Sequence, residues 1–228
     1  MKVAVIDYGV GNLGSVARSL EELKVKPILV DRPVDVHSAD TIILPGVGNF
    51  AECAKILEND GWDKVLLEEV NEREKPILGI CLGMQLLASF GFEGSLNSDS
   101  ESTRGLGLIP GSVINLKDLG CNLNIPHVGW NEVKYSSSFK GLFNDIPENT
   151  DFYFVHSYVF VPDNPNHIIV GQKIKNGPNS EIKVGNCLPL QDIPVGINIH
   201  NVEIQPGAGG KIARSAGSSV TISGLDGN

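Results

Sequence analysis

The chain has 228 residues, of which 41% are hydrophobic and 20% charged, a composition typical of a globular protein rather than a disordered or collagen-like one. Its net charge of −9 disfavours nucleic acid as a partner of the bulk of the chain, because phosphate binding needs a basic face. No apolar run approaches the roughly 18–20 residues of a membrane helix, and no signal-peptide core follows Met1.

The four cysteines are not closely paired, which predicts reduced thiols. We therefore expect a soluble, cytoplasmic protein without a membrane anchor, and the sequence gives no indication of a metal or cofactor. The cysteines are Cys53, Cys81, Cys121 and Cys187.

The first hundred residues alternate between apolar runs and helical spacing. An apolar run at residues 3–6 stops before Gly9, as a buried parallel strand would, and helical spacing follows from Leu13 to Leu23. This alternation predicts an α/β fold with an open, mostly parallel sheet and helices on both faces. Further strands are expected at Pro27–Val30, Thr41–Leu44 and Pro76–Ile80, and helices at Ala51–Glu72, in two pieces broken near Gly61, and from Met84 to Ala88.

The pattern changes after residue 104. Two apolar runs flank Pro110-Gly111, which predicts a hairpin, and Phe152–Val161 predicts one long strand. All 14 aromatic residues lie at or before Phe160, and no helical period follows Pro162. An open sheet that began this way would normally finish with more strands and a covering helix, so we expect a truncated α/β fold followed by a short β-rich segment.

A cysteine between two glycines is the strongest candidate for chemistry. Cys81 follows an expected strand and precedes an expected helix, with Gly79 and Gly83 two residues to either side. This pattern is typical of a nucleophile elbow with sulfur in place of oxygen, in which the backbone amide of Leu82 would stabilise an oxyanion. The helix would also favour the thiolate through its amino end. The alternative is a small buried cysteine in a glycine turn.

A second glycine turn follows the strand at Thr41–Leu44. It reads Pro45-Gly46-Val47-Gly48, and glycines of this kind let backbone amides approach a ligand closely. An ordinary turn at the end of a strand explains the motif equally well. Beside the Cys81 elbow it becomes a candidate second oxyanion donor.

Residues 1 to about 170 resemble the glutaminase subunit of imidazole glycerol phosphate synthase, a class I glutamine amidotransferase. The resemblance covers about three quarters of the chain, and the motifs are specific as a set. They are Ile6-Asp7-Tyr8-Gly9-Val10-Gly11-Asn12-Leu13, Leu44-Pro45-Gly46-Val47-Gly48-Asn49-Phe50, Leu78-Gly79-Ile80-Cys81-Leu82-Gly83-Met84-Gln85-Leu86-Leu87, Gly105-Leu106-Gly107-Leu108-Ile109, Ile125-Pro126-His127-Val128-Gly129-Trp130-Asn131 and Tyr153-Phe154-Val155-His156-Ser157-Tyr158.

The resemblance implies that Cys81 attacks the side-chain amide of glutamine, forming a thioester and releasing ammonia. It also implies a heterodimer, in which the ammonia passes to a β/α-barrel cyclase subunit of histidine biosynthesis. Glutamine would be held by Gly46, Val47, Gly48, Leu82, Gln85, His156, Ser157 and Tyr158.

The sequence departs from that family at the catalytic base. The family completes its triad with His-Pro-Glu near the carboxyl end, and none of the five histidines here is followed by Pro-Glu. His127 and His156 belong to other family motifs, while His37 and His167 lie among loop-like residues and are interpreted as solvated. His200 precedes Asn201-Val202-Glu203, but its surroundings match a different family.

That family is ribosomal protein two of the large subunit, whose carboxyl-terminal region resembles residues 180–222, including Pro206-Gly207-Ala208-Gly209-Gly210. The resemblance implies a small RNA-binding β-barrel. Only Lys211 and Arg214 supply positive charge in the glycine-rich part, so RNA is an unlikely partner.

We therefore interpret the chain as a fusion near residues 171–179, with a glutamine amidotransferase-like domain at 1–174 and a ribosomal-protein-like segment at 179–228. A natural rearrangement, a frameshift or an assembly artefact would each give this sequence. The expected function is that of a glutaminase subunit, impaired by the missing His-Pro-Glu. The alternatives are a catalytically dead remnant that binds the partner, and an RNA-associated fragment acting through the tail.

Overall fold

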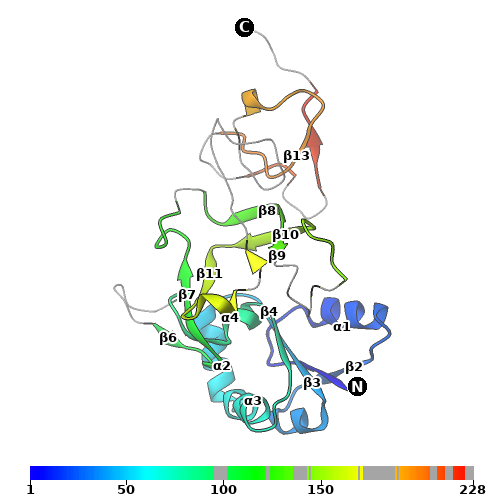
Figure 1. Cartoon of the computed structure of the whole chain (residues 1–228), viewed down its shortest axis with the longest axis vertical. Coiled ribbons are helices and arrows are strands. Elements are labelled where there is room, and N and C mark those ends of the chain that lie inside the picture. The colour runs from blue at the N-terminus through cyan, green and yellow to red at the C-terminus, as the bar shows by residue number, and fades with distance from the viewer. Residues whose placement is uncertain are drawn as a thin grey trace. The chain divides into compact units, whose positions relative to one another are not determined.

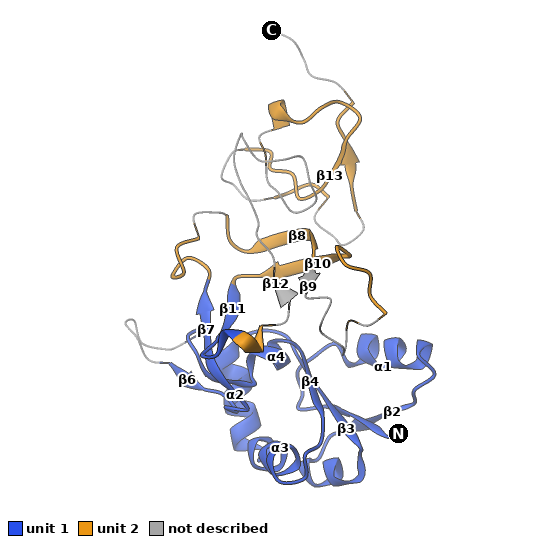
Figure 2. Ribbon diagram, in the orientation of Figure 1, with its two compact units in different colours: residues 1–115, 158–165 blue, residues 116–157, 166–228 orange. Residues whose placement is uncertain are grey.

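The structure is a computed structural model, and it forms two compact units (Figure 2). Unit 1 comprises residues 1–115 and 158–165, and unit 2 comprises residues 116–157 and 166–228. The fusion expected near residues 171–179 lies, apart from residue 171, outside the described residues. These are residues 1–94, 102–121, 124–135, 143, 145–168, 170–171, 188, 190–205, 210–213 and 218–223.

Unit 1 is built on a four-stranded parallel sheet with the strand order β2-β1-β3-β4 (Figure 1). The strands lie where the apolar runs predicted them, because short β-rich runs between glycine and proline turns suit buried parallel strands. Their bounds are β1 Val3–Ile6, β2 Pro27–Val30, β3 Thr41–Gly46 and β4 Ile77–Cys81.

Helices cover both faces of this sheet, as predicted. On one face, Val3 and Val5 of β1 pack with side chains of α1 (Leu13–Glu22). On the other face, Ala4 and Ile6 belong to the main core cluster, which includes residues of α2 (Phe50–Asn59) and α3 (Trp62–Asn71). Successive residues of β1 therefore face opposite layers. A 3-10 helix, η1 (Pro33–Ser38), precedes β3.

Asparagine and glycine set the boundaries of these helices. The side chains of Asn12 and Asn49 accept hydrogen bonds from backbone amides in the first turns of α1 and α2, which satisfies amides that have no partner within the helix. Gly61 adopts the left-handed conformation, with φ 78°, between α2 and α3. The break predicted near Gly61 is therefore confirmed.

A second sheet in unit 1 has the order β11-β7-β5-β6. β5 and β7 are parallel, whereas β11 and β6 pair with them in the antiparallel direction. β11 therefore completes the sheet after a long excursion of the chain through unit 2. The bounds are β5 Ala88–Gly91, β6 Thr103–Arg104, β7 Ile109–Asn115 and β11 Tyr158–Pro162.

The expected helix from Met84 to Ala88 is wrong in its extent. The helix α4 is one turn long, Leu82–Gln85, and Ala88 already begins β5. Ala88 pairs with Ile109 of β7, a partner 21 positions along the chain, so non-local strand pairing overrides the local helical preference.

The hairpin expected at Pro110-Gly111 is also wrong. Both residues lie inside β7. A Cβ atom at Gly111 would come within 2.5 Å of the Val161 carbonyl oxygen. Gly111 therefore allows β11 to approach β7 closely, and it does not reverse the direction of the chain.

The described residues of unit 2 form three small antiparallel sheets, β10-β8, β12-β9 and β13-β14. The long strand predicted at Phe152–Val161 is interrupted at Ser157, so that β10 belongs to unit 2 and β11 to unit 1. The bounds are β8 His127–Glu132, β9 Lys134–Tyr135, β10 Asp151–His156, β12 Val170–Gly171, β13 Asn198–Ile199 and β14 Val220–Thr221, with 3-10 helices at η2 Pro165–His167 and η3 Leu190–Asp192.

Among the residues that the structure describes, one side of β4 is exposed. β4 is the last strand of the parallel sheet, and Leu78 and Ile80 are 40% and 36% exposed. Leu78 is in register with Ile43, which packs on the α1 side of the sheet. Within the described ranges no residue after Gln85 is α-helical.

Candidate active site

Cys81 stands at the carboxyl end of β4, at a sharp turn into α4. Its backbone has φ 54° and ψ −116°, a region that residues other than glycine rarely occupy, and its side chain is exposed. A strained, exposed residue between a strand and a helix has the geometry predicted for the elbow. The alternative of a buried cysteine in a glycine turn is excluded by the exposure.

Close packing explains the glycines around Cys81. A Cβ atom at Gly79 would overlap the backbone of Met84, and one at Gly83 would overlap the carbonyl oxygen of Leu44. At Gly46, a Cβ atom would lie 2.6 Å from the backbone nitrogen of Gly83. α4 can therefore lie directly on β3 and β4 only because these positions carry no side chain.

The two predicted oxyanion elements meet at this edge of the sheet. Gly46 at the end of β3 is the register partner of Cys81 at the end of β4. Val47 is exposed, and Gly48 has φ 98° with open space around its Cβ position. This arrangement leaves the backbone of residues 46–48 and the amide of Leu82 near one another, beside the thiol.

The contribution expected from a helix dipole at Cys81 has to be corrected. α4 contains four residues, too few for the aligned peptide dipoles of a full-length helix to act on the thiol. Any activation of Cys81 in this geometry comes from nearby groups and not from a long helix.

Gln85 and Tyr158, both predicted to hold glutamine, are brought together from distant parts of the chain. The Gln85 side-chain amide nitrogen donates to the Tyr158 carbonyl oxygen at 3.4 Å. This contact joins α4 to the start of β11 within unit 1. Of the other residues predicted to hold glutamine, Gly46, Val47, Gly48 and Leu82 belong to unit 1, whereas His156 and Ser157 belong to unit 2.

Sequence reasoning missed a role for Tyr8 in this site. Its hydroxyl is buried and lies 3.0 Å from the Cβ position of Gly46. Burial, reinforced by the neighbouring Cys53, raises the pKa of Tyr8, so the phenol remains protonated. The Cys53 thiol donates to the carbonyl oxygen of Val47 at 3.6 Å. Tyr8 and Cys53 thus pack directly beneath the Gly46–Gly48 turn.

In unit 2, His156 is paired with His127. They are register partners on β10 and β8, and the Nδ1 atom of His127 and the Nε2 atom of His156 share a hydrogen bond of 3.1 Å. Burial and then the charge of His156 lower the pKa of His127, against an opposing effect of Asn131, so His127 favours the neutral form. The sequence motifs identified both histidines but not their pairing.

The tail histidine lies on the same strand pair. The Nε2 atom of His200 lies 3.0 Å from the Cβ position of Gly129 in β8, and the side chain of the next residue, Asn201, donates to the Val128 carbonyl oxygen at 3.4 Å. Burial lowers the pKa of His200. His167 is exposed, as predicted.

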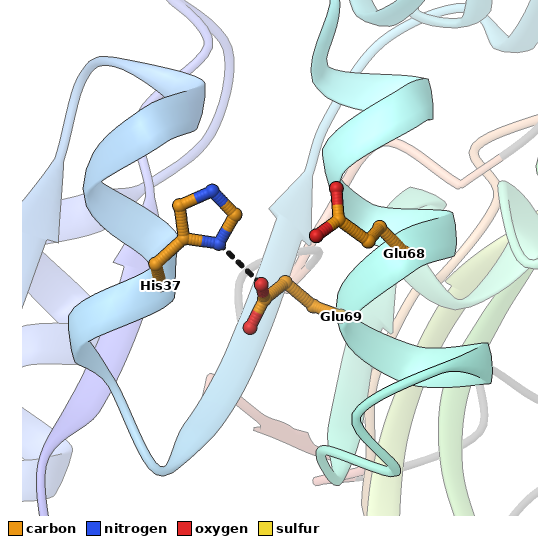
Figure 3. Close-up of side chains that lie close together, drawn as sticks. All are labelled: His37, Glu68 and Glu69. Carbon is orange, nitrogen blue, oxygen red and sulfur yellow. Dashed lines mark hydrogen bonds and ion pairs between the residues drawn. The ribbon is translucent and has the colours of Figure 1, made fainter.

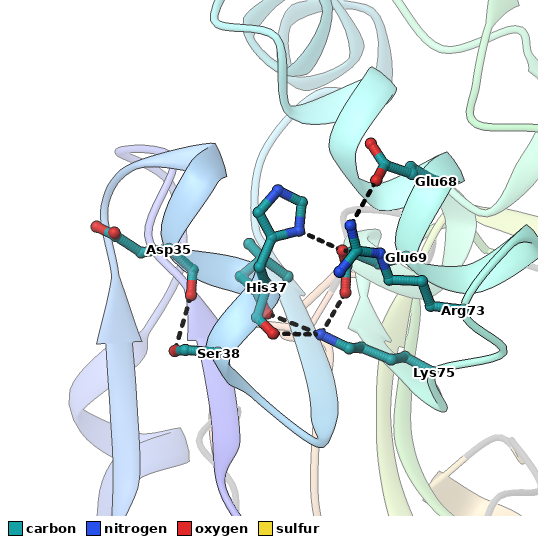
Figure 4. A network of polar contacts seen from close by, with 8 residues as sticks. Asp35, His37, Ser38, Glu68, Glu69, Arg73 and Lys75 are labelled. Atoms are coloured by element: carbon teal, nitrogen blue, oxygen red, sulfur yellow. Dashed lines mark hydrogen bonds and ion pairs between the residues drawn. The ribbon is translucent and has the colours of Figure 1, made fainter.

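His37 is exposed, as its interpretation as a solvated residue predicts, but it also has a partner that the sequence does not indicate. His37 of η1 forms a hydrogen bond with Glu69 of α3, a carboxylate that is 0% exposed (Figure 3). Lys75 and Arg73 contact the same carboxylate, and Arg73 also reaches Glu68 (Figure 4). The buried acid recruits the histidine because an isolated buried charge is strongly unfavourable.

This cluster stabilises the fold and is a poor metal site. Ligand atoms of His37, Glu68 and Glu69 lie within 4.8 Å of one another. However, Lys75 and Arg73 already neutralise Glu69, and they would repel a cation. Burial alone would raise the pKa of Glu69, but hydrogen bonds from Lys75 and His37, with the charges of Lys75 and Arg73, lower it overall.

In the part of the chain that the structure describes, no helix is long and apolar enough to cross a membrane.

Comparisons with known proteins agree with this fold. The profile of "Glutamine amidotransferase class-I" matches residues 4–186, and that of "Ribosomal Proteins L2, C-terminal domain" matches residues 183–228. The two matches support both resemblances predicted from the sequence.

Individual relatives point to the same family. "Imidazole glycerol phosphate synthase subunit HisH 1" of Campylobacter jejuni is 43% identical over 156 residues, 68% of this chain and 74% of the relative. "Imidazole glycerol phosphate synthase subunit HisH" of Moorella thermoacetica is 44% identical over 160 residues, 70% of this chain and 71% of the relative.

A solved structure described as a glutamine amidotransferase superposes with a TM-score of 0.52 at 17% identity, covering 69% of this chain and 72% of the other. This similarity supports the fold, and the sequence relatives establish the family. The chain belongs to the class-I glutamine amidotransferases.

Proposed function

We propose that this chain is a glutaminase subunit of the imidazole glycerol phosphate synthase type, working in histidine biosynthesis in the cytoplasm. The observation that carries the proposal is the elbow at Cys81: an exposed thiol with φ 54° at the end of β4, in register with Gly46. The relatives at 43% and 44% identity, which are named as subunits of imidazole glycerol phosphate synthase, suggest the reaction type.

In the proposed reaction, the Cys81 thiolate attacks the side-chain amide carbon of glutamine. The oxyanion forms beside the Leu82 amide and the backbone of residues 46–48, and ammonia leaves when the C–N bond breaks. Water then hydrolyses the thioester to glutamate and frees the thiol. Gln85, His156, Ser157 and Tyr158 would hold the substrate, and the ammonia would pass to a β/α-barrel cyclase subunit in a heterodimer.

Two proton transfers in this scheme need a base. The thiol must lose a proton before attack, and the leaving nitrogen must gain one. A positioned acid–base group contributes about 10²–10⁴-fold to such steps. Because no histidine of this chain precedes Pro-Glu, we propose that the chain as it stands turns glutamine over very slowly. The proposed cause is a foreign segment at 179–228 following a glutaminase domain at 1–174.

The test is to measure glutamate formation by this chain and by a repaired chain, each with a cyclase subunit and its ligand. The repaired chain carries the ending of the Moorella thermoacetica relative in place of residues 172–228. We expect the repaired chain to be at least about 100-fold faster, and Cys81→Ala to abolish its activity. Equal rates for the two chains would overturn the impairment, and His200→Ala would then test whether His200 is the base. An inactive repaired chain that still binds the cyclase would overturn the glutaminase assignment.

A second candidate rests on the ribosomal-protein match at residues 183–228, which favours an RNA-associated tail. The acidic balance of the chain and the few basic residues of the tail oppose it. Filter binding with ribosomal RNA at low salt separates the candidates, since an absence of binding removes the RNA role and leaves the glutaminase proposal untouched.

A further inference from the structure

Unit 1 contains a cavity of about 180 Å³ away from Cys81. It lies among α2, α3 and the segment from Arg104 to Leu106. Its apolar lining includes Leu57, Leu86 and Leu106, which are 2%, 0% and 7% exposed and belong to the main core. The cavity thus has a rigid apolar wall formed by the core itself.

The remaining lining carries charges of both signs. Glu58 of α2 and Asp63 of α3 supply carboxylates, and Arg104 of β6 supplies a guanidinium. The Oδ1 atom of Asp63 is shielded from solvent and accepts no hydrogen bond within the described ranges. Shielded polar atoms without a partner are uncommon in native proteins, and each calls for a water or a ligand.

The guanidinium of Arg104 likewise has no hydrogen-bond or ion-pair partner among the residues that the structure describes. It forms no ion pair with a carboxylate in the described part of the chain, although Glu58 and Asp63 line the same cavity. The opposite charges are therefore held apart on different elements. A molecule that carries both an ammonium and a carboxylate group could contact both.

We propose that this cavity binds a small zwitterion with an apolar side chain, namely a free aliphatic α-amino acid. The ammonium group lies against the carboxylates of Glu58 and Asp63, the carboxylate contacts Arg104, and the side chain packs on the leucines. Charge-assisted hydrogen bonds of this kind are the stronger ones in proteins, and the apolar wall selects against a polar side chain such as that of glutamine.

The size and chemistry of the cavity support this class of ligand. A cavity of 150 Å³ lined by apolar side chains is known to bind benzene, so one of about 180 Å³ suits a ligand slightly larger than benzene. A metal ion is disfavoured because only two carboxylates line the cavity and Arg104 opposes a cation. Within the described residues, the three-ligand group lies instead at His37, Glu68 and Glu69.

The test is isothermal titration of the full chain with L-leucine, compared with isopentylamine, which lacks the carboxylate, and 4-methylpentanoate, which lacks the ammonium. We expect saturable binding of leucine, and at least about tenfold weaker binding of either fragment. Arg104→Gln and Asp63→Asn should each weaken leucine binding by a similar factor. Both side chains are at least partly exposed and have no ion-pair partner among the described residues. The variants should therefore fold, which circular dichroism would verify.

Two controls complete the experiment. Arg18→Gln removes an exposed arginine of α1, whose contact is with Ser15, and should leave leucine binding unchanged. Cys81→Ala should also leave it unchanged, which separates this cavity from the proposed glutamine site. The proposal is overturned if leucine binding does not saturate or if the fragments bind as well as leucine. It is also overturned if neither Arg104→Gln nor Asp63→Asn changes leucine binding, and in that last case a water occupies the cavity.

Discussion

A methyl group at position 83 would overlap the backbone carbonyl oxygen of Leu44. The carbonyl belongs to β3, in the centre of the parallel sheet, so neither side of this contact can move easily. We expect Gly83→Ala to lower the free energy of unfolding by about 1–3 kcal/mol, the usual range for overpacking, in urea denaturation.

Gly14 in α1 is the matched control for Gly83→Ala. Its Cβ position meets only the end of the Arg18 side chain, at 3.6 Å. Gly14→Ala should stabilise the chain by about 0.5 kcal/mol, because alanine favours the helix. If both substitutions had the same effect, the close approach of α4 to β3 would not be what requires Gly83.

Backbone strain at Cys81 predicts a difference between two substitutions that both remove the thiol. Glycine adopts φ 54° and ψ −116° readily, whereas alanine retains the strain. We expect Cys81→Gly to be more stable than Cys81→Ala by about 1 kcal/mol, after allowing for the greater freedom of glycine in the unfolded chain. Thermal or urea unfolding of the two variants measures the difference, and an alanine variant as stable as the glycine variant would argue against a strained elbow.

Exposure predicts the order in which the described thiols react. Cys81 is exposed, Cys121 is partly buried and Cys53 is buried. Iodoacetamide near neutral pH should therefore alkylate Cys81 first and Cys53 last, as followed by peptide mass spectrometry over time. Burial also raises the pKa of Cys53, which reduces its thiolate further. Equal rates at the three positions would contradict the geometry of the elbow.

Loss of the Glu69 carboxylate should destabilise unit 1. Glu69→Gln would leave Lys75 and Arg73 without their shared anion, and breaking buried ion pairs typically costs about 3–5 kcal/mol. The pKa of Glu69 is lower in the folded protein than in the unfolded chain, where it is about 4.3. The ionised carboxylate therefore stabilises the fold at pH values above the unfolded pKa, and this stability is lost as the pH falls through the folded pKa. Unfolding measured from pH 6 to pH 3 should show this loss in the parent chain but a smaller one in Glu69→Gln.

The exposed side of β4 should make the chain prone to association. Leu78 and Ile80 expose apolar surface on β4, which has no further strand partner among the described residues, and both features favour association. We expect light scattering to rise with concentration, and Ile80→Thr to reduce it. Leu23→Ser, which changes an exposed leucine at the end of α1, serves as the control. A reversible melt of a monomer above about 60 °C would contradict this expectation.

The parts of the fold that the sequence predicts correctly are those decided locally. The apolar run Val3–Ile6 and the helical spacing after Asn12 predict a strand and a helix from the local sequence alone. Gly61 separates two helices because only glycine readily adopts its left-handed conformation. The errors arise where a distant segment decides the outcome. Ala88 becomes a strand because β7 is available to pair with it, and Pro110-Gly111 stays extended because β11 packs closely against it.

The candidate site divides in the same way. Two glycines flanking Cys81 predict the elbow, since the motif is short and its geometry is local. Tyr8 beneath Gly46 and His37 beside Glu69 lie in contacts between elements far apart in the chain, and no spacing pattern encodes them. Burial of a tyrosine or an ion pair is a property of packing, which composition and periodicity do not report.

The route of the chain through the second sheet of unit 1 has a consequence for biosynthesis. β7 ends at Asn115, and its antiparallel partner β11 begins only at Tyr158. During translation, β7 therefore lacks its partner strand β11 until residues 116–157 have been synthesised, which takes about 2–8 s at typical elongation rates. A ribosome that stalls within those residues would leave a nascent chain in which Cys81 has emerged but whose second sheet still lacks its outermost strand.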